Sequence, residues 1–210
     1  MQNVNLKCTH KKPLAKIYST KNDDQVSWTQ SYPHIAVDYL TSLNLPKTAK
    51  IIDVGGGTSN FVDALLDLGY NNITVLDISE EALAKSKARL GDRTSQITWI
   101  VTDITSFIPN SEFDFWYDRA VFHFLTDDEY VQSYVDIVSN TLVAGGSFLL
   151  GTFSENGPLK CSGLDIRQYS TEDMQQTFKD RFIPAKCFKH LHTTPFDTSQ
   201  EFQFCGFIRK

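Results

Sequence analysis

The chain alternates short apolar runs with longer stretches in which apolar residues recur every three or four positions. Short apolar runs indicate buried strands, and the longer period indicates helices. Five predicted strands alternate with helices and are followed by a final pair of strands, so we predict an α/β fold. It consists of a seven-stranded, mostly parallel sheet with one antiparallel strand and helices on both faces. The predicted strands span 51–54, 73–76, 97–101, 113–117, 147–153, 182–192 and 201–208, and the helices 33–43, 61–68, 79–90, 126–140 and 171–178.

Three consecutive glycines follow the first predicted strand and lead into a helix. Gly55, Gly56 and Gly57 stand between Val54 and the apolar helical positions that begin at Phe61. Glycine permits positive φ, and because it lacks Cβ a ligand can lie directly against the backbone. The turn therefore indicates a nucleotide-like ligand, with a merely tight strand-to-helix connection as the alternative.

Three successive predicted strands carry an aspartate at or next to the carboxyl end, namely Asp53, Asp77 and Asp103. Open α/β sheets bind ligands at this edge. Asp77 lies about twenty residues beyond the glycines, where an acidic residue would contact ribose hydroxyls. A nicotinamide-binding turn would require a further glycine at position 60, and the chain has Asn60 there.

Asp53 and the following glycine turn resemble the first motif of the class I S-adenosylmethionine-dependent methyltransferases, although Ser59 replaces a glycine often found in it. The resemblance implies a Rossmann-like methyltransferase fold with S-adenosylmethionine as cofactor and S-adenosylhomocysteine as product. It implies that the glycine turn accommodates the methionine part, that Asp77 holds the ribose and that Asp103 receives the adenine amino group. The implied cofactor-binding residues are Trp28, Asp53, Gly55, Gly56, Gly57, Asp77, Ile78, Asp103, Ile104 and Asp118.

Two stretches resemble the thiopurine-methyltransferase-like branch of this class. In that branch an aromatic residue at the position of Trp28 approaches the methionine end of the cofactor, and a packed aromatic is the alternative. The pair Asp118 and Arg119 follows the fourth strand, beside the transferring methyl group in the family. Burying charges there is costly unless they face a cleft or each other. Together with His123 they are the candidate catalytic residues, against the alternatives of a structural salt bridge and a packed histidine.

The length of 210 residues is enough for one domain with a substantial core. We expect a single methyltransferase domain at 27–210, preceded by an arm at 1–26 with few periodic apolar positions. The segment 27–45 is expected to contain a helix that covers the cofactor. The polar loop 154–170 leaves the carboxyl end of a strand and is expected to be a lid over the acceptor.

Composition and residue spacing argue against several classes of partner and binding site. The net charge is −5 and the lysines are scattered, so nucleic-acid binding is not expected. No apolar run is long enough to cross a membrane. His190 and His192 share one face of a strand but have no evident third ligand, so no metal site is predicted. Reduced thiols in a cytoplasmic protein are expected, since no CxxC or metal-ligand spacing occurs among Cys8, Cys161, Cys187 and Cys205.

The expected activity is methyl transfer from S-adenosylmethionine to a small-molecule acceptor, with a thiol, selenol or similar heteroatom as the first choice. Such acceptors need little help beyond their own ionisation, whereas an amine or hydroxyl can require a base. Arg119 and Arg167 are candidate partners for an acidic acceptor. The alternatives are a protein lysine N-methyltransferase, which would act on a protein partner through an open cleft, and a non-catalytic cofactor-binding protein.

Overall fold

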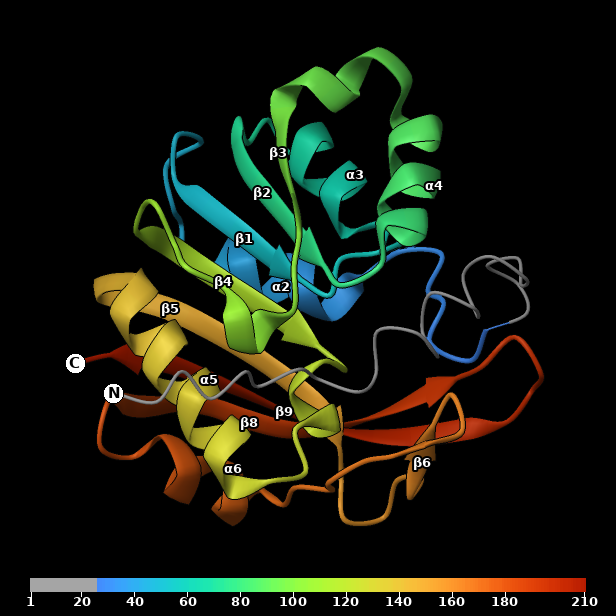
Figure 1. Cartoon of the computed structure of the whole chain (residues 1–210), viewed down its shortest axis with the longest axis vertical. Helices are drawn as coiled ribbons and strands as arrows, with labels where there is room; N and C mark the ends of the chain where they lie inside the picture. Colours follow the sequence, from blue (N-terminus) through green and yellow to red (C-terminus); the bar gives the residue numbers. More distant parts are fainter. Residues whose placement is uncertain (1–25) are drawn as a thin grey trace.

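The computed structural model describes residues 26–210, so the expected arm at 1–26 lies outside the described residues except for Val26. A seven-stranded sheet with helices on both faces forms the body of the protein (Figure 1), as predicted. Its strand order is β3-β2-β1-β4-β5-β9-β8, and β9 alone runs antiparallel to its two neighbours. The strands are β1 (Lys50–Val54), β2 (Asn72–Asp77), β3 (Ile97–Val101), β4 (Phe113–Arg119), β5 (Leu142–Phe153), β8 (Phe182–Thr193) and β9 (Ser199–Arg209).

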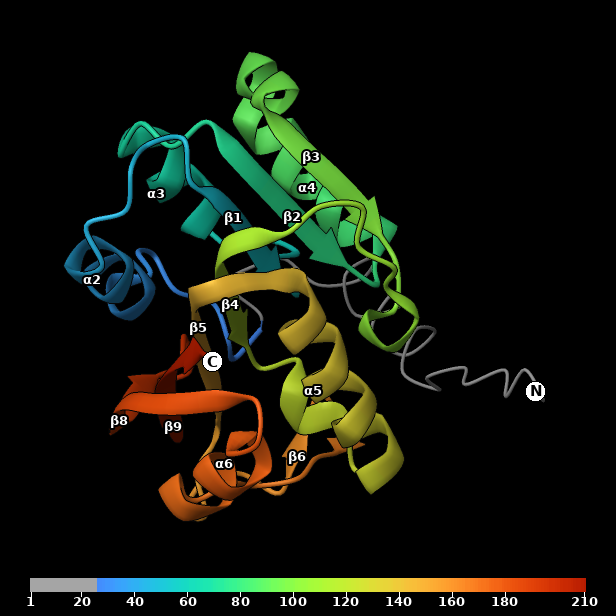
Figure 2. The ribbon, with the colours of Figure 1, turned by 90° about the vertical axis from the view of Figure 1, so that its left-hand side faces the viewer.

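Helices cover the sheet in two groups, which Figure 2 shows on opposite sides. One core lies between the sheet and α2 (His34–Ser42), α3 (Phe61–Asp67) and α4 (Glu80–Leu90). The other lies under α5 (Asp128–Thr141) and α6 (Thr171–Phe178), together with the short helices η3 (Ile104–Ser106) and η4 (Phe122–Phe124). A further short helix, η2 (Gly91–Gln96), leads into β3.

Side-chain alternation along the central strands explains why both faces need a cover. Ile51 contributes to one core and its neighbour Ile52 to the other, and Leu149 and Leu150 divide in the same way. Successive side chains of a strand point to opposite faces, so a strand that is apolar throughout is buried on both. The continuous apolar runs that predicted these strands are therefore the consequence of a two-sided core.

Helix ends follow the predicted signals with one exception. Ser79 caps α4 by accepting a hydrogen bond from the Ala82 backbone N–H (3.2 Å), and α4 ends at Gly91 as predicted. The helix expected from Thr126 instead begins at Asp128 with Asp127 as its N-cap residue. Aspartate and threonine are both favoured at that position, so the local sequence leaves a shift of one residue open.

The fifth strand is longer than predicted. It begins at Leu142 and runs through Gly145 and Gly146, whereas the strand was predicted to start at residue 147. Leu142 pairs with Phe113, whereas Ser147 pairs with Phe115, so β5 carries extra residues opposite β4 at this point. Gly145 has a φ of 76°, which glycine adopts without strain. The two glycines therefore bend a continuous strand.

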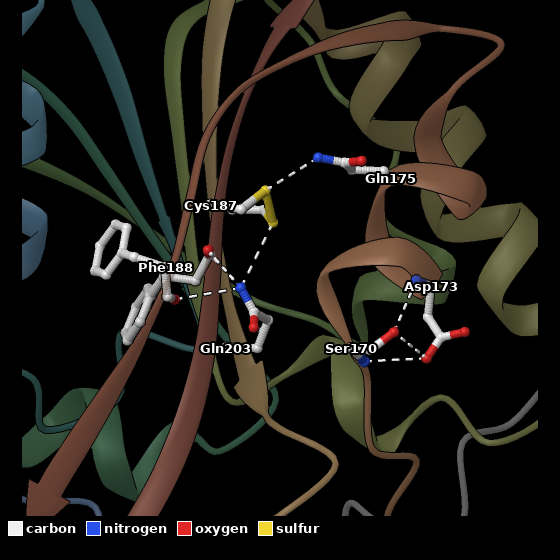
Figure 3. Close-up of a disulfide and its surroundings, with 8 residues drawn as sticks. Ser170, Asp173, Gln175, Cys187, Phe188 and Gln203 are labelled. Carbon is white, nitrogen blue, oxygen red and sulfur yellow. Dashed lines mark hydrogen bonds between the residues drawn. A yellow bond between two sulfur atoms is a disulfide. The ribbon is translucent and has the colours of Figure 1, made fainter.

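The expectation of reduced thiols throughout is wrong. Cys187 of β8 and Cys205 of β9 form a disulfide (Figure 3), with Cα atoms 4.1 Å apart. The two residues face each other in the antiparallel register, and the carboxamide Nε2 of Gln203 contacts the Cys205 sulfur at 3.9 Å. Cysteine spacing along the chain does not contain this cross-strand pairing. Cys161 is free and buried, and Cys8 lies outside the described residues.

The loop that connects β5 to α6 carries a small hairpin. Its strands are β6 (Lys160–Cys161) and β7 (Leu164–Asp165), joined by a tight turn. This hairpin occupies the middle of the segment 154–170 that the sequence predicts to be a lid. Between residues 26 and 210, no helix is long and apolar enough to cross a membrane.

Candidate functional site

A cavity opens where β1, β2 and β4 end, at the edge of the sheet that the aspartates predicted. Its wall also includes part of the loop 154–170 and the segment 26–31, which we call the strap. Seven of the ten predicted cofactor-binding residues line the cavity, and Gly56, Gly57 and Asp118 do not. The seven are Trp28, Asp53, Gly55, Asp77, Ile78, Asp103 and Ile104.

The glycine turn is tightly packed. Gly55 has a φ of 71°, and its N–H donates to the Leu76 carbonyl at 2.7 Å. A Cβ on Gly55 would collide with the side chain of Val121, and a Cβ on Gly56 would lie 2.7 Å from Oδ2 of Asp53. Packing alone therefore requires glycine at both positions.

The three aspartates of the strand ends have different environments. Asp53 is buried, its Oδ2 has no partner among residues 26–210, and burial raises its pKa well above the ordinary value, with the charges of Asp77 and Asp118 adding to this. Asp77 accepts a hydrogen bond from the Ser79 N–H (2.8 Å), and burial raises its pKa to about 6. Asp103 accepts from the Thr105 N–H and hydroxyl. The site thus holds oriented carboxylates, one with an unused acceptor oxygen.

Asp118 lies behind the cavity wall. Its Oδ1 accepts hydrogen bonds from the N–H groups of Val121 and Phe122 (3.0 and 3.4 Å), at the start of η4. Its Oδ2 accepts from the Tyr134 hydroxyl at 2.5 Å, and burial raises the pKa of Asp118 to about 7. Asp118 makes no ion pair with Arg119 within the described chain. It therefore holds η4 against the end of β4.

His123 is fully buried between Phe124 and Phe153 and does not line the cavity. Its Nδ1 accepts a hydrogen bond from the Phe153 N–H at 3.4 Å, and its Nε2 has no partner among the described residues. Burial, with a smaller effect of Arg119, lowers the pKa of His123 to about 3. The structure thus places His123 as a neutral, packed side chain, and its catalytic role stays a prediction.

The strap is anchored by three elements that are far apart in the sequence. Arg119 Nη1 donates to the Trp28 carbonyl (2.8 Å), and Asn60 Nδ2 donates to the Gln30 carbonyl (2.9 Å). His192 Nε2 of β8 lies 2.8 Å from the Ser27 carbonyl oxygen. Sequence reasoning missed these anchors, because it treated Asn60 only as a departure from a nicotinamide motif and His192 only as a possible ligand or base. The aspartate-rich edge therefore has a cover that comes from the N-terminal side.

Residues 51–146 match the family model described as a methyltransferase domain. These residues form a methyltransferase domain. It is similar to an eEF1A lysine and N-terminal methyltransferase of Mus musculus, at 26% identity over 90% of this chain and 30% of that protein. It is also similar to malonyl-[acyl-carrier protein] O-methyltransferase 2 of Ilyobacter polytropus, at 26% identity over 63% of this chain and 54% of that protein. The chain thus spans about a third to a half of these relatives.

The fold of the methyltransferase also matches a solved structure. The N-methyltransferase NodS from Bradyrhizobium japonicum, in complex with S-adenosylhomocysteine, superposes with a TM-score of 0.72 at 17% identity. The match covers 97% of this chain and 99% of that one. The assignment to the thiopurine-methyltransferase-like branch stays a prediction.

The NodS structure holds S-adenosylhomocysteine, and the sequence resemblance implies S-adenosylmethionine as the cofactor of this chain. The cavity fits it, because ribose hydroxyls donate hydrogen bonds and the buried Asp77 and Asp53 offer carboxylate acceptors. The positive sulfonium is favoured by the negative charge that Asp77 carries above its pKa of about 6. Gly55 is the one glycine of the turn that lines the cavity, so a ligand there would lie against its backbone.

Proposed function

We propose that the methyltransferase transfers a methyl group from S-adenosylmethionine to a small-molecule acceptor, with a thiol, selenol or similar heteroatom as the nucleophile. The observation that supports this most is the covered cavity. The strap contributes Trp28, Thr29 and Gln30 to its wall, and the loop 154–170 contributes Cys161 and Ser162. A cavity walled from both sides suits a small acceptor better than a side chain on a large protein. Excluding water and aligning the reactants account for much of such a rate.

Apart from the three aspartates, which the resemblance assigns to the cofactor, the ionisable groups of the cavity support an acceptor that supplies its own ionised nucleophile. When bound, S-adenosylmethionine supplies a methyl group on a positive sulfur, and the acceptor forms its bond to carbon as the old carbon–sulfur bond breaks. Of the described lining residues, none is a histidine or lysine. Burial raises the pKa of Tyr117, and it raises that of Cys161 to about 11, so neither is a base near neutral pH. A thiolate or selenolate needs no base.

The likeness of the Asp118-Arg119 pair to thiopurine methyltransferases also supports a small heteroatom acceptor. One comparison favours a second candidate, a protein lysine N-methyltransferase. The relative from Mus musculus is named for lysine and N-terminal methylation of eEF1A and matches 90% of this chain. An amine of a protein would have to enter past the strap or past the loop 154–170.

The test uses methyl-labelled S-adenosylmethionine with a panel of small thiols, selenols, amines and carboxylates, and in parallel with a cell protein extract. We expect label in the small-molecule fraction, and less of it with Asp77→Ala, which removes the ribose contact. Label confined to precipitated protein would replace this proposal with the lysine alternative. S-adenosylhomocysteine binding by calorimetry, without label in either fraction, would favour a binding-only role.

A further inference from the structure

The charges of the cavity are unevenly distributed. Asp53, Asp77 and Asp103 stand at the ends of three strands, and the residues that resemble the family's cofactor site come from the first half of the chain. Arg119 is the only cationic residue that lines the cavity within residues 26–210. The cavity therefore combines an acidic cofactor wall with a single positive charge.

Arg119 has no carboxylate partner in the described chain. Its Nη1 donates to the neutral Trp28 carbonyl at 2.8 Å, and its Nη2 has no hydrogen-bond partner there. The guanidinium carbon lies 4.9 Å from the centre of the Phe202 ring. Burial lowers the pKa of Arg119, which remains charged because the guanidinium starts from a very high value. A buried charge without a counter-ion is costly, and an anionic ligand would remove that cost.

Arg119 also acts on groups from the second half of the chain. Burial lowers the pKa of His190 and of His192, and the charge of Arg119 lowers both further. Burial raises the pKa of Cys161, a residue of the loop 154–170, and the charge of Arg119 lowers it. Together with the contact to Phe202 of β9, these effects are consistent with an Arg119 charge that acts on the β8–β9 side of the cavity.

We propose that the methyltransferase selects acceptors that carry an anionic group, such as a carboxylate, on a small apolar body, and that Arg119 is the specificity-determining counter-ion. This inference rests on the proposed function, since it describes the acceptor of the same site. The apolar body is matched by lining side chains such as Tyr117, Phe124 and Leu125. Arginine binds carboxylates through a planar fork of donors, which lysine lacks.

A matched set of acceptors tests the charge preference. The full-length protein with saturating S-adenosylmethionine is given 4-mercaptobenzoate, thiophenol and 4-aminothiophenol, and kcat/KM is measured for each. We expect a preference of on the order of tenfold for the carboxylate over thiophenol, as for a charge-assisted hydrogen bond. In Arg119→Met this ratio should fall to about one, and in Arg119→Lys part of it should remain.

Arg119 also holds the strap through the Trp28 carbonyl, so its loss could change kcat/KM for every acceptor. The ratio of kcat/KM values for two acceptors isolates charge recognition, because both acceptors meet the same strap in each variant. Arg167→Met is the matched control: Arg167 is ion-paired with Asp128 at 2.6 Å and does not line the cavity. An unchanged ratio in Arg119→Met overturns the proposal. So does a preference of the unchanged protein for the neutral or amino thiol.

Two further measurements keep this inference distinct from the proposed function. If no thiol is methylated, calorimetry of 4-mercaptobenzoate against 4-aminothiophenol on the protein loaded with S-adenosylhomocysteine still reports the charge preference. Preferred binding of the carboxylate, lost in Arg119→Met, supports the inference, and equal binding overturns it. A third outcome is that Arg119→Met loses far more affinity for S-adenosylhomocysteine than Asn60→Ala does, while the acceptor ratio stays unchanged. Arg119 would then be the partner of the cofactor's own carboxylate, and the inference would be overturned.

Discussion

Tyr134→Phe removes one buried hydroxyl that connects α5 to the end of β4. The Tyr134 hydroxyl donates to the Asp118 carboxylate at 2.5 Å and accepts from Trp116 Nε1 at 3.2 Å. The ring itself packs against Trp116, Phe122 and Phe148, and phenylalanine preserves that packing. The substitution thus isolates the two hydrogen bonds.

Both hydrogen bonds of the Tyr134 hydroxyl are buried, so water does not replace them in the variant. A hydrogen bond to a charged group contributes about 1.5–3 kcal/mol, and a buried N–H left without a partner costs about 1–3 kcal/mol. We therefore expect the free energy of unfolding to fall by about 3–5 kcal/mol. For a chain of this length that corresponds to a decrease in Tm of roughly 10 °C. Thermal unfolding followed by circular dichroism measures it.

The loss should depend on pH. The hydrogen bond from Tyr134 lowers the pKa of Asp118 against the burial that raises it to about 7, so it favours the ionised carboxylate. Its removal then costs more at pH 8.5, where Asp118 is ionised, than at pH 5.5, where it is protonated. Tyr130→Phe on the same helix is the control. An equal loss at both pH values, or a loss no larger than that of Tyr130→Phe, would refute the reasoning.

Three further changes test the site and the core. Asp77→Asn should weaken S-adenosylhomocysteine binding in calorimetry. With Asp77 in place, the affinity should decrease as the pH falls below about 6, because Asp77 becomes protonated there. The variant should lack this decrease. A binding curve with the same pH dependence in both proteins would contradict the role of Asp77. Gly151→Ala should lower the Tm, because its Cβ would lie 2.9 Å from Cδ1 of Phe204 in a full core, and an unchanged Tm would show that the ring moves aside. Asn60→Ala removes both hydrogen bonds to the strap carbonyls, so S-adenosylhomocysteine should dissociate faster in stopped-flow measurements. An unchanged dissociation rate would mean that the strap does not retain the ligand.

Local patterns were sufficient for the sheet and for the acidic wall of the cavity. The apolar runs predicted the seven strands because both faces of the sheet are buried, so a strand differs from its surroundings within a few residues. Asp77 ends β2 and Asp103 lies two residues beyond the end of β3, and strand ends that lie side by side bring such residues together. Each of these predictions needed only neighbours in the sequence.

Long-range pairing explains what the sequence did not reveal. Asp118 was recognised as a charge that must be satisfied, but its partner Tyr134 lies 16 positions later on a helix. The disulfide depends on the register of β8 against β9, which no spacing rule contains. The strap anchors join positions up to 165 residues apart. A residue's type indicated that a partner exists, and only the fold identifies it.

The three anchors named above bind main-chain carbonyl groups of the strap, those of Ser27, Trp28 and Gln30, whereas Gln200 Nε2 donates to the Ser27 hydroxyl. Any amino acid carries the same carbonyl, so replacing a strap side chain leaves these hydrogen bonds in place. Such an arrangement separates closure of the site from the shape of the surface that closes it. Descendants of this chain are thus able to exchange strap side chains, and with them the acceptors they admit, while the cover stays attached to the same three points.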